Sequence, residues 1–176
     1  MRVVSGSAGG RRLEVPDGST TRPTTDRVRE AVFNSLYSLD AIGGARVLDL
    51  FAGSGALGIE ALSRGAESAV FVETDRRARQ VIEGNLESLG FTDITKVVNA
   101  DGASYLDRAA PYDLLMLDPP YGFDEWDELL AKVHDSMVVI ESDREIAVPD
   151  HWSVHRARRY SATVVTLATA TAKPGE

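Results

Sequence analysis

Four residues that could hold a nucleic-acid base follow an apolar run at residues 112–117, and they read Asp118, Pro119, Pro120 and Tyr121. Two consecutive prolines remove two backbone donors and restrict the chain, so the carbonyls of this turn stay free and rigidly aimed. The Asp118 carboxylate and the Pro119 carbonyl can together accept both hydrogens of an exocyclic amino group, and the Tyr121 ring can stack on a flipped base. Proline turns without a function are common, so these residues predict a base site only together with the signals below.

A second candidate site is the glycine turn at residues 52–58, which follows an apolar strand pattern at residues 47–50. Gly53, Gly55 and Gly58 match the dinucleotide-binding pattern, so NAD is one candidate ligand. Asp49 argues against NAD, because a carboxylate beside the turn would repel a pyrophosphate and attract a cation. S-adenosylmethionine carries an ammonium and a sulfonium and no phosphate, so we favour it. A turn without any ligand would leave the conformational cost of three glycines unexplained.

Acidic residues at the ends of the next two strand patterns complete the predicted cofactor site. Glu73 follows the apolar residues 69–72, where a carboxylate can accept hydrogen bonds from both hydroxyls of a ribose. Asp101 follows residues 94–98, and it can cap the next helix, bind the adenine amino group, or do both. The predicted cofactor residues are Asp49, Phe51, Gly53, Ser54, Gly55, Glu73, Thr74, Asp101 and Gly102. We expect no metal in the site.

Composition limits the classes of protein that this chain can belong to. The 176 residues contain no cysteine, which excludes disulfides and thiolate metal sites and is consistent with a cytoplasmic protein. No window is long and apolar enough to span a membrane, and the N-terminus lacks the apolar region of a signal peptide. The formal net charge is -8 at pH 7, so a nucleic-acid partner would need a local basic patch.

The N-terminus is the predicted location of that patch. Residues 1–12 carry arginines and no acidic residue, and strand patterns at residues 3–4 and 13–15 predict a β-hairpin arm within residues 1–22. We expect the arm to recruit RNA without contributing to the packing of the core; a frayed terminus with solvated charges is the alternative. The predicted RNA-binding residues are Arg2, Arg11, Arg12, Arg22 and Arg27, with Arg29 beside them and with Arg156, Arg158 and Arg159 as a second location.

The rest of the pattern predicts one α/β domain over residues 23–176. A helix with an apolar stripe covers residues 25–39, and another long helix follows Glu73 and reaches residue 89. Strand patterns lie at residues 47–50, 69–72, 94–98, 112–117, 138–140, 152–158 and 162–168, of which the last two are expected to be antiparallel. Strands that alternate with helices predict a Rossmann-like fold, with a seven-stranded, mostly parallel sheet, helices on both faces and one antiparallel strand.

Four stretches of the chain resemble one family. They are Gly6-x-x-x-Gly10-Arg11-x-Leu13, Arg22-Pro23-Thr24-Thr25-Asp26-Arg27-Val28-Arg29-Glu30, Asp49-Leu50-Phe51-Ala52-Gly53-Ser54-Gly55 and Asp118-Pro119-Pro120-Tyr121. Over nearly the whole chain the sequence resembles RsmD, the bacterial 16S rRNA guanine-N2 methyltransferase family. The resemblance implies a class I methyltransferase fold, S-adenosylmethionine as methyl donor, S-adenosylhomocysteine as product, and guanine 966 as the target base. It also implies 16S rRNA as partner, within an assembled or assembling small ribosomal subunit, for a protein that we expect to be monomeric and cytoplasmic.

Two other functions stay open at this point. The Asp118 tetrapeptide also resembles the motif of adenine-N6 DNA methyltransferases, although this chain shows no separate target-recognition domain. A non-catalytic protein that binds the cofactor and assists ribosome assembly would carry the same cofactor residues. A methyl-transfer assay on small subunits, naked rRNA and DNA separates these three classes.

Overall fold

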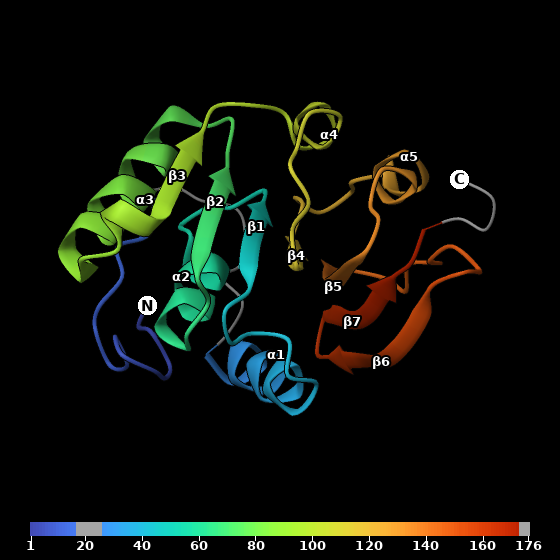
Figure 1. Cartoon of the computed structure of the whole chain (residues 1–176), viewed down its shortest axis with the longest axis horizontal. Helices are drawn as coiled ribbons and strands as arrows, with labels where there is room; N and C mark the ends of the chain where they lie inside the picture. The colour runs from blue at the N-terminus through green and yellow to red at the C-terminus, as the bar shows by residue number, and fades with distance from the viewer. Residues whose placement is uncertain (17–25, 173–176) are drawn as a thin grey trace.

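The computed structural model describes residues 1–16 and 26–172, which are arranged around one central sheet (Figure 1). The seven strands lie in the order β3-β2-β1-β4-β5-β7-β6. They are β1 (Arg46–Leu50), β2 (Ser68–Val72), β3 (Thr95–Val98), β4 (Leu114–Leu117), β5 (Ser136–Ser142), β6 (Ser153–Tyr160) and β7 (Thr163–Ala170). The helices are α1 (Asp26–Ser38), α2 (Ala56–Ser63), α3 (Arg76–Leu89), α4 (Gly102–Leu106) and α5 (Trp126–Ala131), with a 3-10 turn η1 (Thr92–Ile94).

The sheet has the predicted doubly wound topology. β1 pairs in parallel with β2 and β4, and the parallel pairing continues to β3 on one side and to β5 on the other. β7 is antiparallel to both of its neighbours, β5 and β6, so it is the one strand that runs against the other six. The Rossmann-like prediction is therefore confirmed, including the antiparallel pairing of the last two strands. Within the described residues, no helix is long and apolar enough to cross a membrane.

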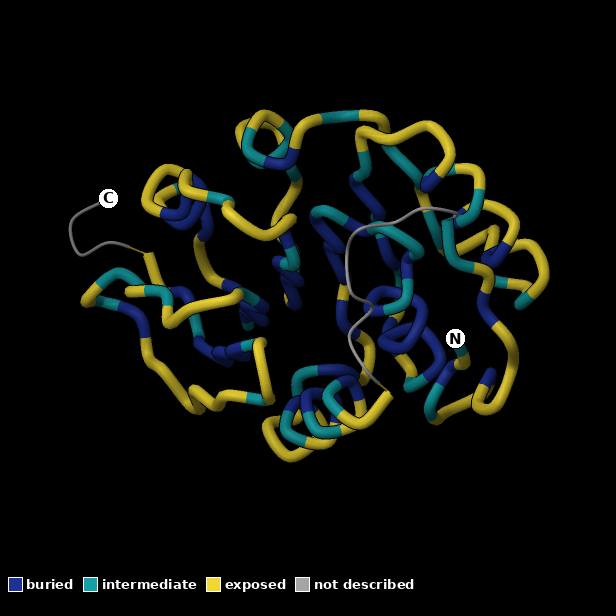
Figure 2. The backbone as a smooth tube through the Cα atoms, turned by 180° about the vertical axis from the view of Figure 1, so that it is seen from behind, coloured by how far each residue is buried: buried dark blue, intermediate teal, exposed yellow. Residues whose placement is uncertain are grey.

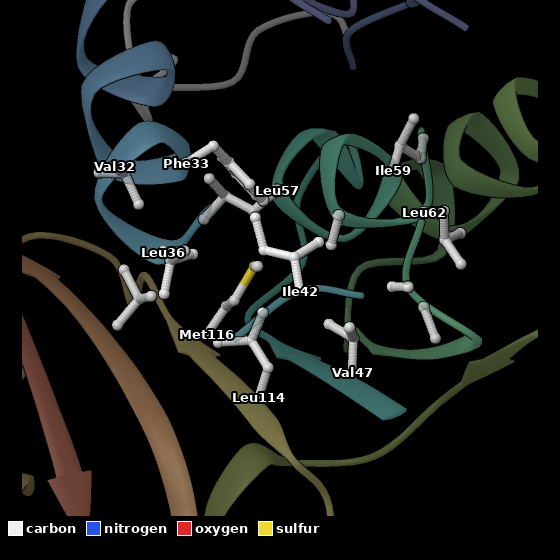
Figure 3. Close-up of a cluster of buried hydrophobic side chains, with 14 of the residues drawn as sticks. Val32, Phe33, Leu36, Ile42, Val47, Leu57, Ile59, Leu62, Leu114 and Met116 are labelled. Atoms are coloured by element: carbon white, nitrogen blue, oxygen red, sulfur yellow. The ribbon is translucent and has the colours of Figure 1, made fainter. Parts of the chain in front are cut away.

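Apolar side chains cover both faces of the sheet. On one face, Val47 and Met116 belong to one apolar cluster with Phe33 of α1 and Leu57 of α2, as Figure 3 shows. On the other face, the strands pack against α4 and α5. Because both faces are covered, the central strands are apolar along their length, and all four residues of β4 are buried. This packing fixes the carboxyl ends of β1, β4 and β5 relative to one another.

Two predicted helix starts are capped by acidic side chains. Asp75 caps α3 by accepting a hydrogen bond from the backbone nitrogen of Ala78 at 2.7 Å, and Gly90 ends this helix in the left-handed conformation. Asp101 caps α4 by accepting from the backbone nitrogen of Ser104 at 3.0 Å. Helix α5 is not visible in the sequence pattern, because a helix of six residues is too short to show a clear apolar stripe.

The N-terminal segment, residues 1–16, is part of the core, which corrects one expectation. Val3 and Leu13 are only 1% and 2% exposed, and Ala8 is also buried. All three belong to the apolar cluster that α1, α2 and α3 form with the sheet. The expectation that the core packs without this segment is therefore wrong. The predicted domain boundary between residues 22 and 23 lies outside the described residues.

The two predicted strands of this segment are reduced to a single antiparallel bridge between Arg2 and Arg12. Backbone nitrogens beside the bridge still pair across the hairpin: that of Val3 donates to the carbonyl of Arg11 and that of Leu13 to the carbonyl of Met1, each at 2.9 Å. The pairing extends no further because the next backbone donors of the first stretch pair with a helix side chain. The backbone nitrogens of Val4 and Ser5 donate to the two carboxylate oxygens of Glu60 at 2.7 and 3.0 Å. Glu60 lies on α2 and is fully buried, so the segment supplies the donors that this charge needs.

Arg29 has a structural position that the sequence analysis did not predict. Its side chain is fully buried; it lies 2.9 Å from the Asp26 carboxylate and 3.7 Å from that of Glu60. It also donates to the backbone carbonyl of Arg2. The interpretation of Arg29 as part of a basic surface is therefore wrong, whereas its neighbour Arg27 is exposed.

Candidate active site

Three acidic residues come together at the carboxyl ends of β1, β4 and β5. The register aligns Leu117 with both Leu50 and Ile140, so Asp118 and Glu141 follow at the same level of the sheet. Asp49 is aligned with Met116, two residues before Asp118, and side chains two residues apart on a strand point to the same face. Asp49, Asp118 and Glu141 therefore share one face, the face that α1 and α2 cover.

Asp49 lies beneath the start of α2. It is 1% exposed, and its Oδ2 accepts a hydrogen bond from the backbone nitrogen of Gly58 at 2.9 Å. Burial raises the pKa of Asp49 to about 8, although the bond from Gly58 opposes the shift. A side chain at position 58 would lie 2.4 Å from the ring of Phe71, which explains the third glycine of the turn by packing.

Asp118 shares this electrostatic environment. Burial raises its pKa well above the ordinary value of a carboxyl, and the charges of Glu141 and Asp49 raise it further. Part of its surface nevertheless remains exposed, so a ligand can reach it. Glu141 and Asp49 thus oppose the ionisation of Asp118, and a positive charge bound nearby would favour it. Sequence reasoning missed Glu141, although its position directly after the apolar residues 138–140 was a visible signal.

The glycine turn is held by the carboxylate at the end of β2. Glu73 Oε2 accepts from the backbone nitrogen of Gly53 at 2.9 Å, and Oε1 accepts from that of Asp75 at 2.8 Å. Phe51, Gly53 and Gly55 all have positive φ, with values of 62°, 57° and 78°. For Phe51 this conformation is strained, and strain of this kind is concentrated at functional sites. Glu73 thus joins the ends of β1 and β2 and keeps further lone pairs for a ligand.

Asn85 of α3 connects this turn to the N-terminal segment and was also missed. Its Nδ2 donates to the carbonyl of Ser54 at 3.2 Å and to that of Glu14 at 3.0 Å. Its Oδ1 accepts from the backbone nitrogen of Glu14 at 2.9 Å. The visible signal was an amide at position 85, midway between Val81 and Leu89 on the apolar stripe of the helix.

Aromatic rings connect the glycine turn to the Asp118 turn. The rings of Phe51 and Phe123 lie edge to face with centroids 5.5 Å apart, and Phe123 makes the same contact with Trp126 at 5.2 Å. Gly102 lies against Phe51, because a Cβ at this position would be 3.0 Å from the ring. The end of β1, the start of α4 and the residues after β4 are therefore one packed unit.

The remaining predicted site residues lie at the rim of this unit. Tyr121 is 53% exposed, so its ring is available to a ligand, while Pro119 is buried and Pro120 is exposed. Thr74 and Asp101 are exposed at the ends of the strands β2 and β3. The structure thus places all the predicted catalytic and cofactor residues at one edge of the sheet, where the parallel strands end.

The predicted RNA-binding residues of the N-terminal segment lie elsewhere. The backbone nitrogen of Ser7 donates to the carbonyl of Ser63 at 2.7 Å, and Arg11 donates to the carbonyl of Ser88 at 2.7 Å. Both acceptors are near the C-terminal ends of their helices, α2 and α3, which run from the site back to the edge where the strands begin. Arg2, Arg11 and Arg12 are therefore exposed near the opposite edge of the sheet. Arg22 lies outside the described residues.

Comparisons with known proteins agree with this geometry. Residues 1–169 match the family model described as "Conserved hypothetical protein 95". The chain is 42% identical over 161 residues to "Putative rRNA methyltransferase YlbH" of Bacillus subtilis, which covers 85% of this chain and 86% of the relative. It is 39% identical over 169 residues to "Ribosomal RNA small subunit methyltransferase D" of Escherichia coli, which covers 90% of this chain and 84% of the relative.

A solved structure shows the same fold over nearly the whole chain. "Putative methyltransferase yhhF from Escherichia coli" is 36% identical, superposes with a TM-score of 0.86, and the match covers 98% of this chain and 99% of that one. The class I methyltransferase architecture expected from the sequence is thereby confirmed, and so is the resemblance on which that expectation rested. The chain belongs to the RsmD family of ribosomal RNA methyltransferases.

Proposed function

We propose that this protein transfers a methyl group from S-adenosylmethionine to the exocyclic N2 of a guanine in 16S rRNA, with guanine 966 as the target. The observation that carries the proposal is the position of Asp118. Its turn lies beside the glycine turn, at the same sheet edge and on the same face as Asp49. A base held at Asp118 would therefore meet a donor held at the glycine turn.

The residues present fit the proposed donor. When bound, S-adenosylmethionine supplies a methyl group on a positively charged sulfur. Asp49 would provide the negative field for its cations. Burial raises the pKa of Asp49 to about 8 in the free protein, and a positive charge bound beside it would lower that pKa and favour the ionised form. Glu73 would accept from the ribose hydroxyls, and Asp101 would accept from the adenine amino group, since both carboxylates retain unused lone pairs. We propose no role for a metal.

The Asp118 turn would hold the acceptor base. The Asp118 carboxyl and the Pro119 carbonyl accept from the amino group and aim its nitrogen at the methyl carbon, while Tyr121 stacks on the ring. The nitrogen lone pair forms the new N–C bond as the C–S bond breaks, and S-adenosylhomocysteine leaves. The methylated nitrogen then loses one proton to Asp118 or to water. Positioning and exclusion of water supply the catalysis, without a covalent enzyme intermediate.

The relatives support rRNA as the substrate. Two of them carry names that specify rRNA methylation, and one of those names specifies the small subunit. We therefore place the reaction on the 16S rRNA of an assembled or assembling subunit, in the cytoplasm, with the protein acting as a monomer. The Asp118 tetrapeptide itself does not select guanine over adenine, so DNA adenine methylation is the principal competing function.

A labelled-methyl assay tests the proposal. Small subunits that lack the modification, naked 16S rRNA and adenine-containing duplex DNA are each incubated with the protein and labelled S-adenosylmethionine. The proposal predicts label in the rRNA of the subunits, and its loss in the Asp118→Ala variant. Label in DNA alone would support the adenine methyltransferase. Cofactor binding without label in any acceptor would support a non-catalytic assembly factor.

A further inference from the structure

The edge strand β6 carries an unusual concentration of positive charge. Its eight residues include Arg156, Arg158, Arg159 and His155 and no acidic residue, in a chain whose net charge is -8. Residues 153–159 are all exposed, and Figure 1 shows β6 as the outermost strand beyond β7. In Figure 2 the tube along this edge has the yellow of exposed residues, whereas the central strands are dark blue, the colour of buried residues.

The arginines of β6 are not neutralised by neighbouring carboxylates. Within the part of the chain that the structure describes, none of the three forms an ion pair, whereas Arg46, Arg64 and Arg144 each pair with an aspartate or glutamate. The contacts of the β6 arginines are with uncharged groups. Arg156 donates to the hydroxyl of Ser35 on α1 at 2.9 Å. Arg158 lies over the ring of Tyr160 at 5.3 Å, and Arg159 lies 3.5 Å from the carbonyl of Asp143.

The end of β6 is level with the candidate active site. Arg158 is paired with Val165, and Val165 is paired with Glu141, which is the residue level with Asp118. Paired residues on neighbouring strands point to the same face, so Arg158 shares the face of Asp118. Three strand spacings separate β4 from β6, which corresponds to about 14 Å across the sheet. A nucleic acid with one base at Asp118 would extend over this distance.

Edge strands often carry charges that prevent pairing with another chain, and this is the simplest alternative explanation. Charges of either sign would prevent such pairing. Because this chain has more acidic than basic residues, acidic residues would be expected on the strand as well.

Strand β6 has only positive charges. Arg158 is level with Asp118 and Arg156 with Met116, whereas the arginines of the N-terminal segment lie near the end of the sheet where the parallel strands begin. Arg156 shares the face of Arg158, whereas Arg159 is paired with Val164 and points to the opposite face. We propose that Arg156 and Arg158 bind the phosphates of the RNA strand that flanks the base held at Asp118. This inference rests on the proposed function.

The test compares two double variants of equal net charge. Arg156→Ala with Arg158→Ala removes two charges from β6, and Lys96→Ala with Arg108→Ala removes two exposed charges from β3 and the residues after α4. The salt dependence of binding to naked 16S rRNA is measured for both. The logarithmic slope should fall by about 1.5 for the β6 variant, because each phosphate contact contributes about 0.7–0.9. The control variant should keep the wild-type slope.

Steady-state methylation of small subunits provides the second readout. The β6 variant should show a KM for subunits raised about tenfold with kcat changed less than twofold, and an unchanged affinity for S-adenosylmethionine. Replacement of both arginines by lysine should restore the slope, since the charge is retained. Equal slopes and equal KM values for the β6 and control variants would overturn the proposal. Failure of the wild-type protein to methylate any RNA would refute the proposed function instead, and the binding slopes would still decide the location of the RNA.

Discussion

Asp49 carries a charge that the free protein accommodates poorly. Its carboxyl is buried and accepts one backbone hydrogen bond, and burial raises its pKa to about 8. Asp118 and Glu141 lie close by on the same face of the sheet. A buried carboxyl with a raised pKa lowers the stability of the fold, and such groups are concentrated at sites that bind a ligand. A cationic donor would restore the ionised form of Asp49.

Replacement of Asp49 by Asn should therefore stabilise the protein at high pH and weaken cofactor binding. The unfolded chain ionises Asp49 near pH 4, whereas the folded protein does so at about 8. Ionisation of Asp49 thus removes wild-type stability progressively between about pH 4 and pH 8, and Asn cannot ionise. Melting temperatures without cofactor should show an advantage of Asp49→Asn that is larger at pH 9 than at pH 5. An equal difference at both values would contradict the role of the buried charge.

Glu73→Ala should weaken binding of S-adenosylmethionine by about 1–3 kcal/mol, the range for the loss of one such hydrogen-bonding partner. The structure indicates a second contribution to this loss of affinity, because Glu73 also accepts hydrogen bonds from the backbone nitrogens of Gly53 and Asp75. Glu73→Gln keeps one acceptor oxygen and should lose less affinity. Calorimetry with S-adenosylmethionine and NAD measures both effects, and tighter binding of NAD would refute the assignment of the cofactor.

Asp118→Ala should reduce methyl transfer by on the order of 10²–10³-fold, as expected for the loss of one preorganised hydrogen-bonding partner at the reacting group. Affinity for the cofactor should change little, because Glu73 and Asp101 remain. Tyr121→Ala should have a smaller effect through the loss of about 1–3 kcal/mol of stacking. Single-turnover rates on small subunits check this, and wild-type turnover in Asp118→Ala would show that the site is wrong.

At the scale of elements, the N-terminal segment acts as part of the scaffold. It covers α2 with Val3 and Leu13, supplies backbone donors to Glu60, and reaches the glycine turn through Asn85. Its arginines remain predicted RNA contacts, but the segment that carries them is not a separate arm. The packing of this segment and the geometry of the cofactor turn are therefore linked.

Leu13→Ala should destabilise the fold by about 2–5 kcal/mol, the usual cost of truncating a buried leucine. Arg12→Ala is the matched control, because its exposed side chain should contribute less than about 0.5 kcal/mol. Chemical denaturation measures both. A loss for Leu13→Ala no greater than that of the control would mean that the segment can detach, as the sequence analysis expected.

The sequence predicts the elements better than it predicts their contacts. The glycine turn, the Asp101 cap and the Asp118 turn depend on neighbouring residues, so they are visible in the order of the chain. The burial of Arg29 and the position of Glu141 beside Asp118 depend on which strands and helices become neighbours. Those contacts join residues more than twenty positions apart. A single sequence shows that Glu141 follows a strand, but it does not show which strand becomes its neighbour.

At the scale of the whole molecule, different groups lie at the edge of the sheet where the parallel strands end and at the edge where they begin. The edge where the parallel strands end carries the acidic site, the exposed Tyr121 and Arg158 of β6. The edge where they begin carries the contacts of the N-terminal segment with the ends of α2 and α3. An acidic chain can in this way carry basic residues next to an acidic site, and on the proposal made above RNA would approach over β6.

Identification of the methylated nucleoside tests the central claim most directly. Small subunits without the modification are reacted with labelled S-adenosylmethionine, their rRNA is digested to nucleosides, and the label is assigned by mass spectrometry and mapped to its position. The account predicts a single product, N2-methylguanosine, at guanine 966. Label in N6-methyladenosine, or no label in rRNA from a protein that binds the cofactor, would contradict it.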